Sequence, residues 1–270
     1  VYKRQEEDLM RRDFTINALA VNDREEIVDY FNGIEDLEHG IIRCVGNPME
    51  RFNEDALRMM RAVRFAGQLG FSIESDTFNA VRTLKANLER VAVERMKVEF
   101  EKMILSPHRT LAFKAFVESE LYQACPDFKE AKETLLKVGE FPLDKLTITQ
   151  AWILFAYYER LSIPQLRKVL KNWKSSNDQI STVLTGYQTL LARLEKEWDA
   201  FLAYECPEDL AVEVEQLLAG IGRVEELEKL KTVYQQLPIR SMKDIQIDGF
   251  GVKEALGLEK MGPIIGEVLQ

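Results

Sequence analysis

The feature that most constrains the fold is a helical periodicity that begins after Pro48 and continues through most of the chain. Apolar residues recur there at every third or fourth position, which is the spacing of one face of an amphipathic α-helix. Turn-forming residues interrupt this spacing and divide the region into separate helices. The segments predicted to be helical are 53–68, 76–87, 92–105, 109–118, 147–161, 163–173, 177–200, 208–218 and 223–237.

The segment before Pro48 has a different pattern, in which apolar and polar residues alternate. The stretch FTINALAVNDREEIVDYFNG, residues 14–33, shows this alternation on both sides of Asn22-Asp23. Such alternation around a turn sequence is typical of two β-strands. We therefore predict a mainly α fold, in which the end of an α/β domain leads into an all-helical array.

Turn residues within the helical region also suggest domain boundaries. They occur at Gly46-Asn47-Pro48, at Cys125-Pro126 and at Cys206-Pro207. The predicted domains are therefore 1–46, 47–125, 126–206 and 207–270. The first five residues, VYKRQ, match a translated sequencing-library transposon end, and Gln270 stops within an apparent helix. We expect a chain that is truncated at both ends.

The composition limits the class of protein. With 46% hydrophobic and 30% charged residues over 270 positions, the chain can bury a sizeable core, as soluble globular proteins do. Cys44, Cys125 and Cys206 lie too far apart in sequence for a disulfide framework or a zinc site. No apolar run approaches the roughly 20 residues of a spanning helix. We therefore predict a cytoplasmic protein that does not enter the membrane.

One helix-like stretch carries an unusual set of charges. In NEDALRMMRAVRFAGQLGF, residues 53–71, an acid and three arginines follow one another at three-residue spacing, although the net charge of the chain is -9. On one helix that begins at an Asn53 N-cap, these charged side chains would spiral across the polar side. They are Asp55, Arg58, Arg61 and Arg64. The residues expected to form the opposite, buried stripe are Phe52, Ala56, Met59, Met60, Val63 and Ala66.

The Asp55/Arg58 pair has a structural and a functional interpretation. As a solvated ion pair it would stabilise the helix by a few tenths of a kcal/mol. A carboxylate beside a guanidinium also offers an acceptor and a donor, which match the amino group and ring nitrogen of cytosine and adenine. Uracil and guanine have a carbonyl in place of that amino group and an N–H in place of that ring nitrogen, so the hydrogen bonds to Asp55 and to Arg58 would both be lost. Arg61 and Arg64, one and two turns further on, are suited to bind phosphates.

Five motifs, in order, make the chain resemble a known family. The closing stretches LPIRSMKDIQIDG and MGPIIGEVL extend the resemblance over nearly the whole chain. The motifs are RRDFTINALA (11–20), DYFNGIEDL (29–37), EDALRMMRAVRFA (54–66), FSIESDTFNAV (71–81) and RVAVERMKVEFEKMI (90–104). Together they resemble the class II tRNA nucleotidyltransferase and bacterial poly(A) polymerase family, in the form usual for CCA-adding enzymes of Firmicutes type.

The resemblance implies a template-independent enzyme that adds C, C and A to the 3′ end of tRNA from CTP and ATP. It implies the end of a nucleotidyltransferase head, followed by a helical neck, a helical body and part of a tail. It also assigns roles to particular residues: Arg12 contacts the incoming nucleotide and Asn17 lies near the ribose. The pair formed by Asp55 and Arg58 reads the base, while the phosphates are contacted by Arg61 and Arg64.

The resemblance further implies a metal site and a tRNA-binding tail. Two Mg²⁺ ions would bind a DxD pair of carboxylates upstream of RRDFT, a segment that this chain does not contain. We therefore assign no catalytic or metal-binding residue, interpret Asp13 as a supporting residue, and predict that the chain alone is inactive. In the tail, Lys243, Lys253 and Lys260 are candidates for RNA binding, although lysines on helices are more often solvated.

Alternative functions stay open at this stage. A poly(A) polymerase, a CC-adding enzyme or an A-adding enzyme would share the same motifs. A non-catalytic helical RNA-binding protein is a candidate of another class. An in-frame GGxVRD and DxD upstream of this sequence would exclude that last candidate. A homodimer is also left open.

Overall fold

The fold is described from a computed structural model, which describes residues 2–237. The structure is mainly helical, as predicted, and it divides into two compact units. The first unit comprises the chain up to Gln188 together with Gly220–Gly222, and the second comprises Thr189–Ala219 and the residues from Arg223 onward. The finer division into four domains stays a prediction.

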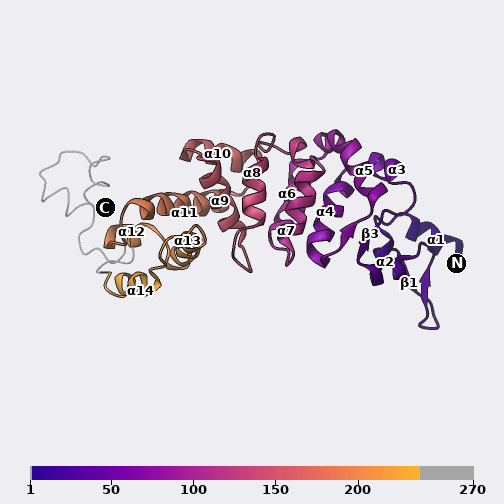
Figure 1. Ribbon diagram of the computed structural model, residues 1–270, viewed down its shortest axis with the longest axis horizontal. Helices are drawn as coiled ribbons and strands as arrows, with labels where there is room; N and C mark the ends of the chain where they lie inside the picture. The colour runs from indigo at the N-terminus through magenta and orange to yellow at the C-terminus, as the bar shows by residue number, and fades with distance from the viewer. Residues whose placement is uncertain (1, 238–270) are drawn as a thin grey trace, which may run out of the picture. The chain divides into compact units, whose positions relative to one another are not determined.

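Most elements of the described chain are helices (Figure 1). The α-helices are α1 (Tyr2–Met10), α2 (Gly33–His39), α3 (Pro48–Glu54), α4 (Leu57–Leu69), α5 (Ser75–Leu84), α6 (Val93–Ile104), α7 (Arg109–Glu118), α8 (Lys132–Gly139), α9 (Ile148–Glu159), α10 (Ile163–Asn172), α11 (Asn177–Glu195), α12 (Ala200–Glu205), α13 (Glu208–Gly220) and α14 (Leu227–Gln235). Short 3₁₀ helices are η1 (Thr15–Asn17), η2 (Lys85–Arg90) and η3 (Leu121–Ala124). The strands are β1 (Leu19–Val21), β2 (Ile27–Asp29), β3 (Ile41–Ile42) and β4 (Ser72–Ile73).

The predicted pair of strands is confirmed. Strands β1 and β2 are antiparallel, with Ala20 opposite Val28. The turn between them is held by Asn22, whose Oδ1 accepts hydrogen bonds from the backbone N–H groups of Arg24 and Glu26 at 2.9 and 3.0 Å. A second, parallel pair, β3 with β4, was not predicted. Each of its strands has only two residues, which is too short to show an alternating pattern.

The predicted single helix over residues 53–68 is wrong in its first turn. Instead, α3 begins at Asn47, whose side chain accepts a hydrogen bond from the N–H of Met49, and it has Pro48 at its first position. It ends at Asp55, which has an extended backbone with φ -145° and ψ 101°. The new helix α4 then starts at Leu57. Asp55 is therefore at a break between two helices.

An aromatic cluster forms the core of the first unit. Phe128 and Trp173 have ring centroids 4.7 Å apart, and Phe100 lies 5.0 Å from Trp173 and 5.8 Å from Trp152. These rings come from α6, α9 and the segments around α8 and α10, so the cluster ties the helices together. Trp152, Phe155, Trp173 and Tyr187 are buried, whereas Tyr157 and Tyr158 are only partly buried.

The second unit is organised around a buried carboxylate. Glu215 on α13 is 0% exposed, and its Oε1 accepts hydrogen bonds from Arg193 Nε at 3.0 Å and from Trp198 Nε1 at 2.8 Å. Its Oε2 accepts one from the backbone N–H of Glu226 at 2.9 Å. Because every donor comes from a different segment, this one side chain fixes the packing of α13 against its neighbours.

The predicted helix 177–200 is wrong near its end. It divides into α11 and α12 because Asp199 acts as a new N-cap, accepting a hydrogen bond from the N–H of Leu202 at 2.8 Å. Lys243, Lys253 and Lys260 lie outside the described residues.

Cys44, Cys125 and Cys206 are free and buried. Burial raises the pKa of Cys44 to about 12, so its thiol is neutral at physiological pH. Within residues 2–237, none of the helices is long and apolar enough to span a membrane.

Helices α4 and α7 approach closely at Gly67. A Cβ added at this glycine would lie 2.5 Å from Ala112 Cβ and 2.7 Å from Ser106 Oγ. Gly67→Ala should lower the free energy of unfolding by about 1 to 2 kcal/mol, because the overlap outweighs the better helix propensity of alanine. Urea unfolding measures this. As a control, Ser181→Ala changes an exposed position of α11 and should stay within about 0.5 kcal/mol. A Gly67→Ala variant more stable than the wild type would contradict the close packing.

Candidate functional site

The carboxylate of Asp13 lies between two arginines of α4. Arg58 Nε is 3.2 Å from Asp13 Oδ1, and Arg61 Nε binds Oδ2. The side chains of Asp13 and Arg58 are each only 14% exposed, so water screens the pair weakly. One carboxylate therefore holds two guanidinium groups in place. This geometry gives the supporting role that we assigned to Asp13 a physical basis.

Arginines also bind the backbone that precedes Asp13. Arg58 Nη2 donates to the carbonyl oxygen of Arg11 at 3.2 Å, and Arg51 Nη2 donates to that of Arg12 at 3.1 Å. These carbonyls follow α1 and have no strand to pair with. The RRDFT segment is thus joined to α3 and α4 through both its backbone and its acidic side chain.

Asp55 and Arg58 do not pair with each other in this structure. Asp55 Oδ2 lies 2.9 Å from Arg95 Nη2 on α6, and its Oδ1 accepts a hydrogen bond from the backbone N–H of Leu57 at 3.1 Å. Arg58 Nη1 instead contacts Glu54 Oε2 at 3.0 Å. The helix break explains this arrangement, since it removes Asp55 from the helical spacing that would place it beside Arg58.

Arg61 and Arg64 are linked through Glu99 on α6. Glu99 Oε2 binds Arg64 Nε, and Oε1 is 4.0 Å from Arg61 Nη1. We expected Arg64 on the polar side of its helix, but its side chain is only 7% exposed. It also binds Gln68 and lies 4.1 Å from the centre of the Phe65 ring. Arg61, by contrast, keeps 32% of its side chain exposed.

Arg12 and Asn17, the other two candidates, flank Asp13. The side chain of Arg12 is 56% exposed and lies 3.6 Å from Asp8. Asn17 ends the short helix η1 and accepts a hydrogen bond from the N–H of Phe14 at 3.1 Å. Arg12 is therefore free to reach a ligand, whereas Asn17 shapes the local backbone.

The buried carboxylate of Asp36 anchors the RRDFT segment. Thr15 Oγ1 donates to Asp36 Oδ2 at 2.6 Å, and Arg43 Nε lies 3.0 Å from the same oxygen. Close packing adds to this, because a Cβ on Gly33 would lie 2.2 Å from the carbonyl oxygen of Thr15. The motifs RRDFT and DYFNGIEDL therefore position each other.

Asp29 caps the turn that leads into α2. Although partial burial works against it, hydrogen bonds from the backbone N–H groups of Ile34, Gly33 and Phe31 hold the pKa of Asp29 below its ordinary value. The carboxylate of Asp29 is thus occupied by the backbone of the turn.

The sequence analysis missed four residues of this network. They are Arg51, Glu54, Arg95 and Glu99. For Glu99 a signal existed, because it lies on the same helical face as the buried Met96, Phe100 and Met103. A charged residue on an apolar stripe must have a buried partner. For Arg95 no such signal existed, since its side chain is 53% exposed.

The described residues do not fit the Mg²⁺ ions that the resemblance implies. Among residues 2–237, no group of three His, Cys, Asp or Glu side chains is placed to hold a metal. Asp13, the acid nearest the arginines, already uses both oxygens to bind Arg58 and Arg61.

Three family models match separate parts of the chain. Residues 1–43 match the family model "Poly A polymerase head domain" and residues 70–132 match "Probable RNA and SrmB- binding site of polymerase A". Residues 145–270 match "tRNA nucleotidyltransferase domain 2 putative".

Individual relatives give the same result. The chain is 40% identical to the CCA-adding enzyme of Ligilactobacillus salivarius and 41% identical to that of Enterococcus faecalis, over 98% of its own length in both cases. It spans 65% and 66% of the length of these relatives. Among solved structures, it is similar to the Bacillus stearothermophilus CCA-adding enzyme in complex with CTP. The identity is 31% and the TM-score 0.85, over 98% of this chain and 68% of the other.

The buried pair of Arg64 and Glu99 gives a test of the network. Glu99→Gln leaves the Arg64 guanidinium buried without a carboxylate, so the free energy of unfolding should fall by about 3 to 5 kcal/mol. Chemical denaturation of the two proteins measures the difference. The same substitution at the exposed Glu94 of α6 is the control and should cost less than about 0.5 kcal/mol. Equal effects of the two substitutions would show that the ion pair does not stabilise the fold.

Proposed function

This chain belongs to the tRNA nucleotidyltransferase and poly(A) polymerase family, and we propose that it acts in the template-independent addition of C, C and A to the 3′ end of tRNA. CTP and ATP are the nucleotide donors in this proposal, and the cytoplasm is its location. The main support for this proposal is that Asp13 of the RRDFT motif forms ion pairs with Arg58 and Arg61 of the EDALRMMRAVRFA motif. We expect both motifs to bind the nucleotide. The similarity to a CCA-adding enzyme in complex with CTP supports it.

In this proposal, Asp55 and Arg58 select the base. The carboxylate of Asp55 accepts a hydrogen bond from the amino group of cytosine or adenine, and the guanidinium of Arg58 donates one to the neighbouring ring nitrogen. Uracil and guanine would place a carbonyl opposite the carboxylate and an N–H opposite the guanidinium. Two polar groups would then stay unpaired, which is how hydrogen-bonding sites reject the wrong substrate.

Base reading requires an exchange of partners. In the absence of nucleotide, Asp55 contacts Arg95 and Arg58 contacts Glu54. Both contacts are accessible, since Arg95 and Glu54 have side chains 53% and 55% exposed. Exposed ion pairs are weak, so a base can replace them at small cost. The contact between Arg58 and Asp13 is more buried, and we propose that it persists when the nucleotide binds.

The remaining arginines supply charge for the triphosphate. The side chains of Arg12 and Arg61 are 56% and 32% exposed, and we propose that they contact phosphate oxygens. Arg64 is almost fully buried against Glu99, so its contribution is the support of the Arg61 side of the network. The proposed place of Asn17 near the ribose rests on the resemblance of RRDFTINALA to the motif of the family.

Metal-dependent chemistry lies outside what these residues do. The described residues bind and orient the nucleotide instead. We still predict that this chain alone does not add nucleotides. A homodimer is still left open.

Removal of the Asp55 carboxylate tests base selection. In the active enzyme, Asp55→Ala should reduce the discrimination of CTP over UTP by about 1 to 3 kcal/mol, which is the range for one lost base contact. The ratio of kcat/KM for the two nucleotides, with tRNA lacking its terminal CCA, measures this. Asp23→Ala, in the hairpin turn, is the control and should leave the ratio unchanged. If Asp55→Ala lowers the rate but keeps full discrimination, Asp55 does not read the base.

A further inference from the structure

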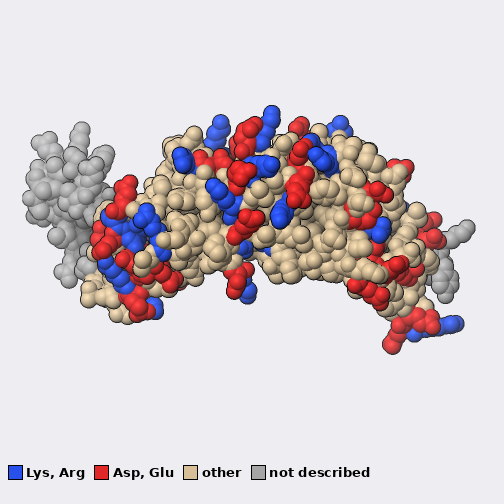
Figure 2. Space-filling model, in the orientation of Figure 1, with Lys and Arg blue, Asp and Glu red and all other residues tan. Residues whose placement is uncertain are grey.

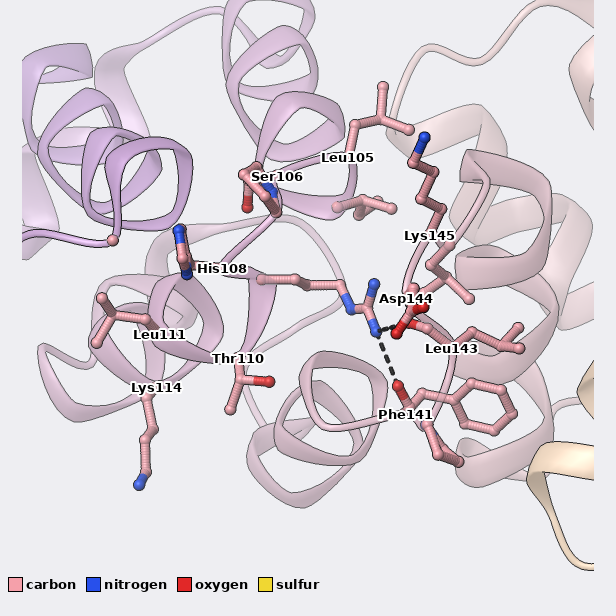
Figure 3. Close-up of a pocket in the computed structure, with 16 residues that line it drawn as sticks. Leu105, Ser106, His108, Thr110, Leu111, Lys114, Phe141, Leu143, Asp144 and Lys145 are labelled. Carbon is pink, nitrogen blue, oxygen red and sulfur yellow. Dashed lines mark hydrogen bonds between the residues drawn. The ribbon is translucent and has the colours of Figure 1, made fainter.

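A cleft of about 1230 Å³ lies in the first unit and shares no residue with the network around Asp13 (Figure 3). One wall is the loop between α6 and α7, with the first turns of α7. The other wall is the loop between α8 and α9, residues 141–146. The cleft is open to solvent and is lined by both apolar and basic side chains.

Arg109 in this cleft is a buried cation without an acidic partner. Only 6% of the residue is exposed. Its Nη2 donates to the carbonyl oxygens of Phe141 and Leu143 at 2.8 and 2.9 Å, which are the dashed lines in Figure 3. Its Nε donates to the carbonyl of Gly139 at 3.3 Å. Within the described chain, no carboxylate forms an ion pair with Arg109, and its Nη1 has no hydrogen-bond partner.

An uncompensated buried charge needs an explanation. Desolvation lowers the pKa of Arg109, but an arginine stays protonated in proteins. Backbone carbonyls at the end of α8 satisfy part of its hydrogen-bonding capacity and carry partial negative charge. They do not neutralise the guanidinium, and burial of an unpaired charge is costly. A bound anion would complete the site.

Two lysines add positive charge at separate points of the cleft. Lys114 and Lys145 are exposed, and neither forms an ion pair with a described residue. Figure 3 shows Lys145 extended toward Leu105 on the same side as Phe141 and Leu143, with Lys114 at the other end of the cleft. Asp144 is the single acid among the described residues that line the cleft. Three unpaired cations spread along an open cleft suit an extended polyanion better than a single small ion.

On the face of the molecule drawn in Figure 2, by contrast, acidic and basic side chains are interspersed. Many arginines of the first unit also have carboxylate partners, as Arg43, Arg58 and Arg95 do. The cleft itself is lined by three basic side chains and one acidic side chain, although the net charge of the chain is -9.

We propose that this cleft binds the sugar-phosphate backbone of the tRNA, with Arg109, Lys114 and Lys145 facing successive phosphates. The identity of the polyanion rests on the proposed function. The family model described as a probable RNA-binding site ends at residue 132, so it includes the first wall and not the second. The second wall contributes Lys145 and the carbonyls that orient Arg109.

The test is the affinity of the 270-residue chain for fluorescently labelled tRNA that lacks its terminal CCA, measured over a series of salt concentrations. Lys145→Ala and Lys114→Ala should each weaken binding about fivefold near 0.1 M salt, and should reduce the slope of log K against log salt by about 0.7 to 0.9. Asp144→Asn should tighten binding, because it removes the negative charge from the cleft. Lys168→Ala, an exposed position of α10 outside the cleft, is the matched control and should change neither quantity.

The outcomes distinguish this inference from the proposed function. If the unaltered chain binds the tRNA and all four variants bind equally well, the cleft does not contact RNA, although the proposed function stands. If inorganic phosphate at constant ionic strength displaces no tRNA but binds the chain in a Lys145-dependent manner, the cleft is a site for free phosphate and the inference is wrong. If the unaltered chain does not bind the tRNA, both this inference and the tRNA substrate of the proposed function are overturned.

Discussion

The two ion pairs of Asp13 are the interaction on which the rest of the candidate site depends. A single carboxylate of an irregular segment binds Arg58 and Arg61, two guanidinium groups that lie one turn apart on α4. Without it, two arginines would share a weakly solvated region with no common counter-charge. Asp13 therefore does more than join two motifs, because it sets the direction in which both arginines can present their remaining donors.

The supports of this centre are graded by burial. Glu99 and Arg64 form the most buried pair, and through the longer contact to Arg61 they support one side of the centre. Asp36 anchors the other side through Thr15. The contacts of Asp55 and Arg58 with Arg95 and Glu54 lie at the accessible edge. Rigid parts are thus buried and exchangeable parts are exposed, which suits a site that must bind and release a nucleotide.

Sequence reasoning predicted the regular parts of this fold and missed its irregular ones. The expected stripe from Phe52 to Ala66 is buried, and the helix predicted over 109–118 coincides with α7, because helical periodicity reports burial directly. The break at Asp55 was missed because a capped turn between two helices keeps the same apolar residues in phase. In consequence, the six candidate residues were predicted without their partners. Arg95 and Glu99 are contributed by α6. The apolar face of α6 indicates that Glu99 needs a buried partner, but no local pattern identifies which residue of a distant helix that partner is.

The most direct test of this account is nucleotide binding by an Asp13→Asn variant of the active enzyme, with Mg²⁺ titrated in parallel. Loss of a charge-assisted contact to both arginines should weaken the binding of CTP and of ATP by about tenfold to a hundredfold each, since such contacts contribute about 1.5 to 3 kcal/mol. The Mg²⁺ requirement should stay unchanged, because the account gives Asp13 no role as a metal ligand. Unchanged nucleotide affinity together with a raised Mg²⁺ requirement would contradict the account and would make Asp13 part of the metal site.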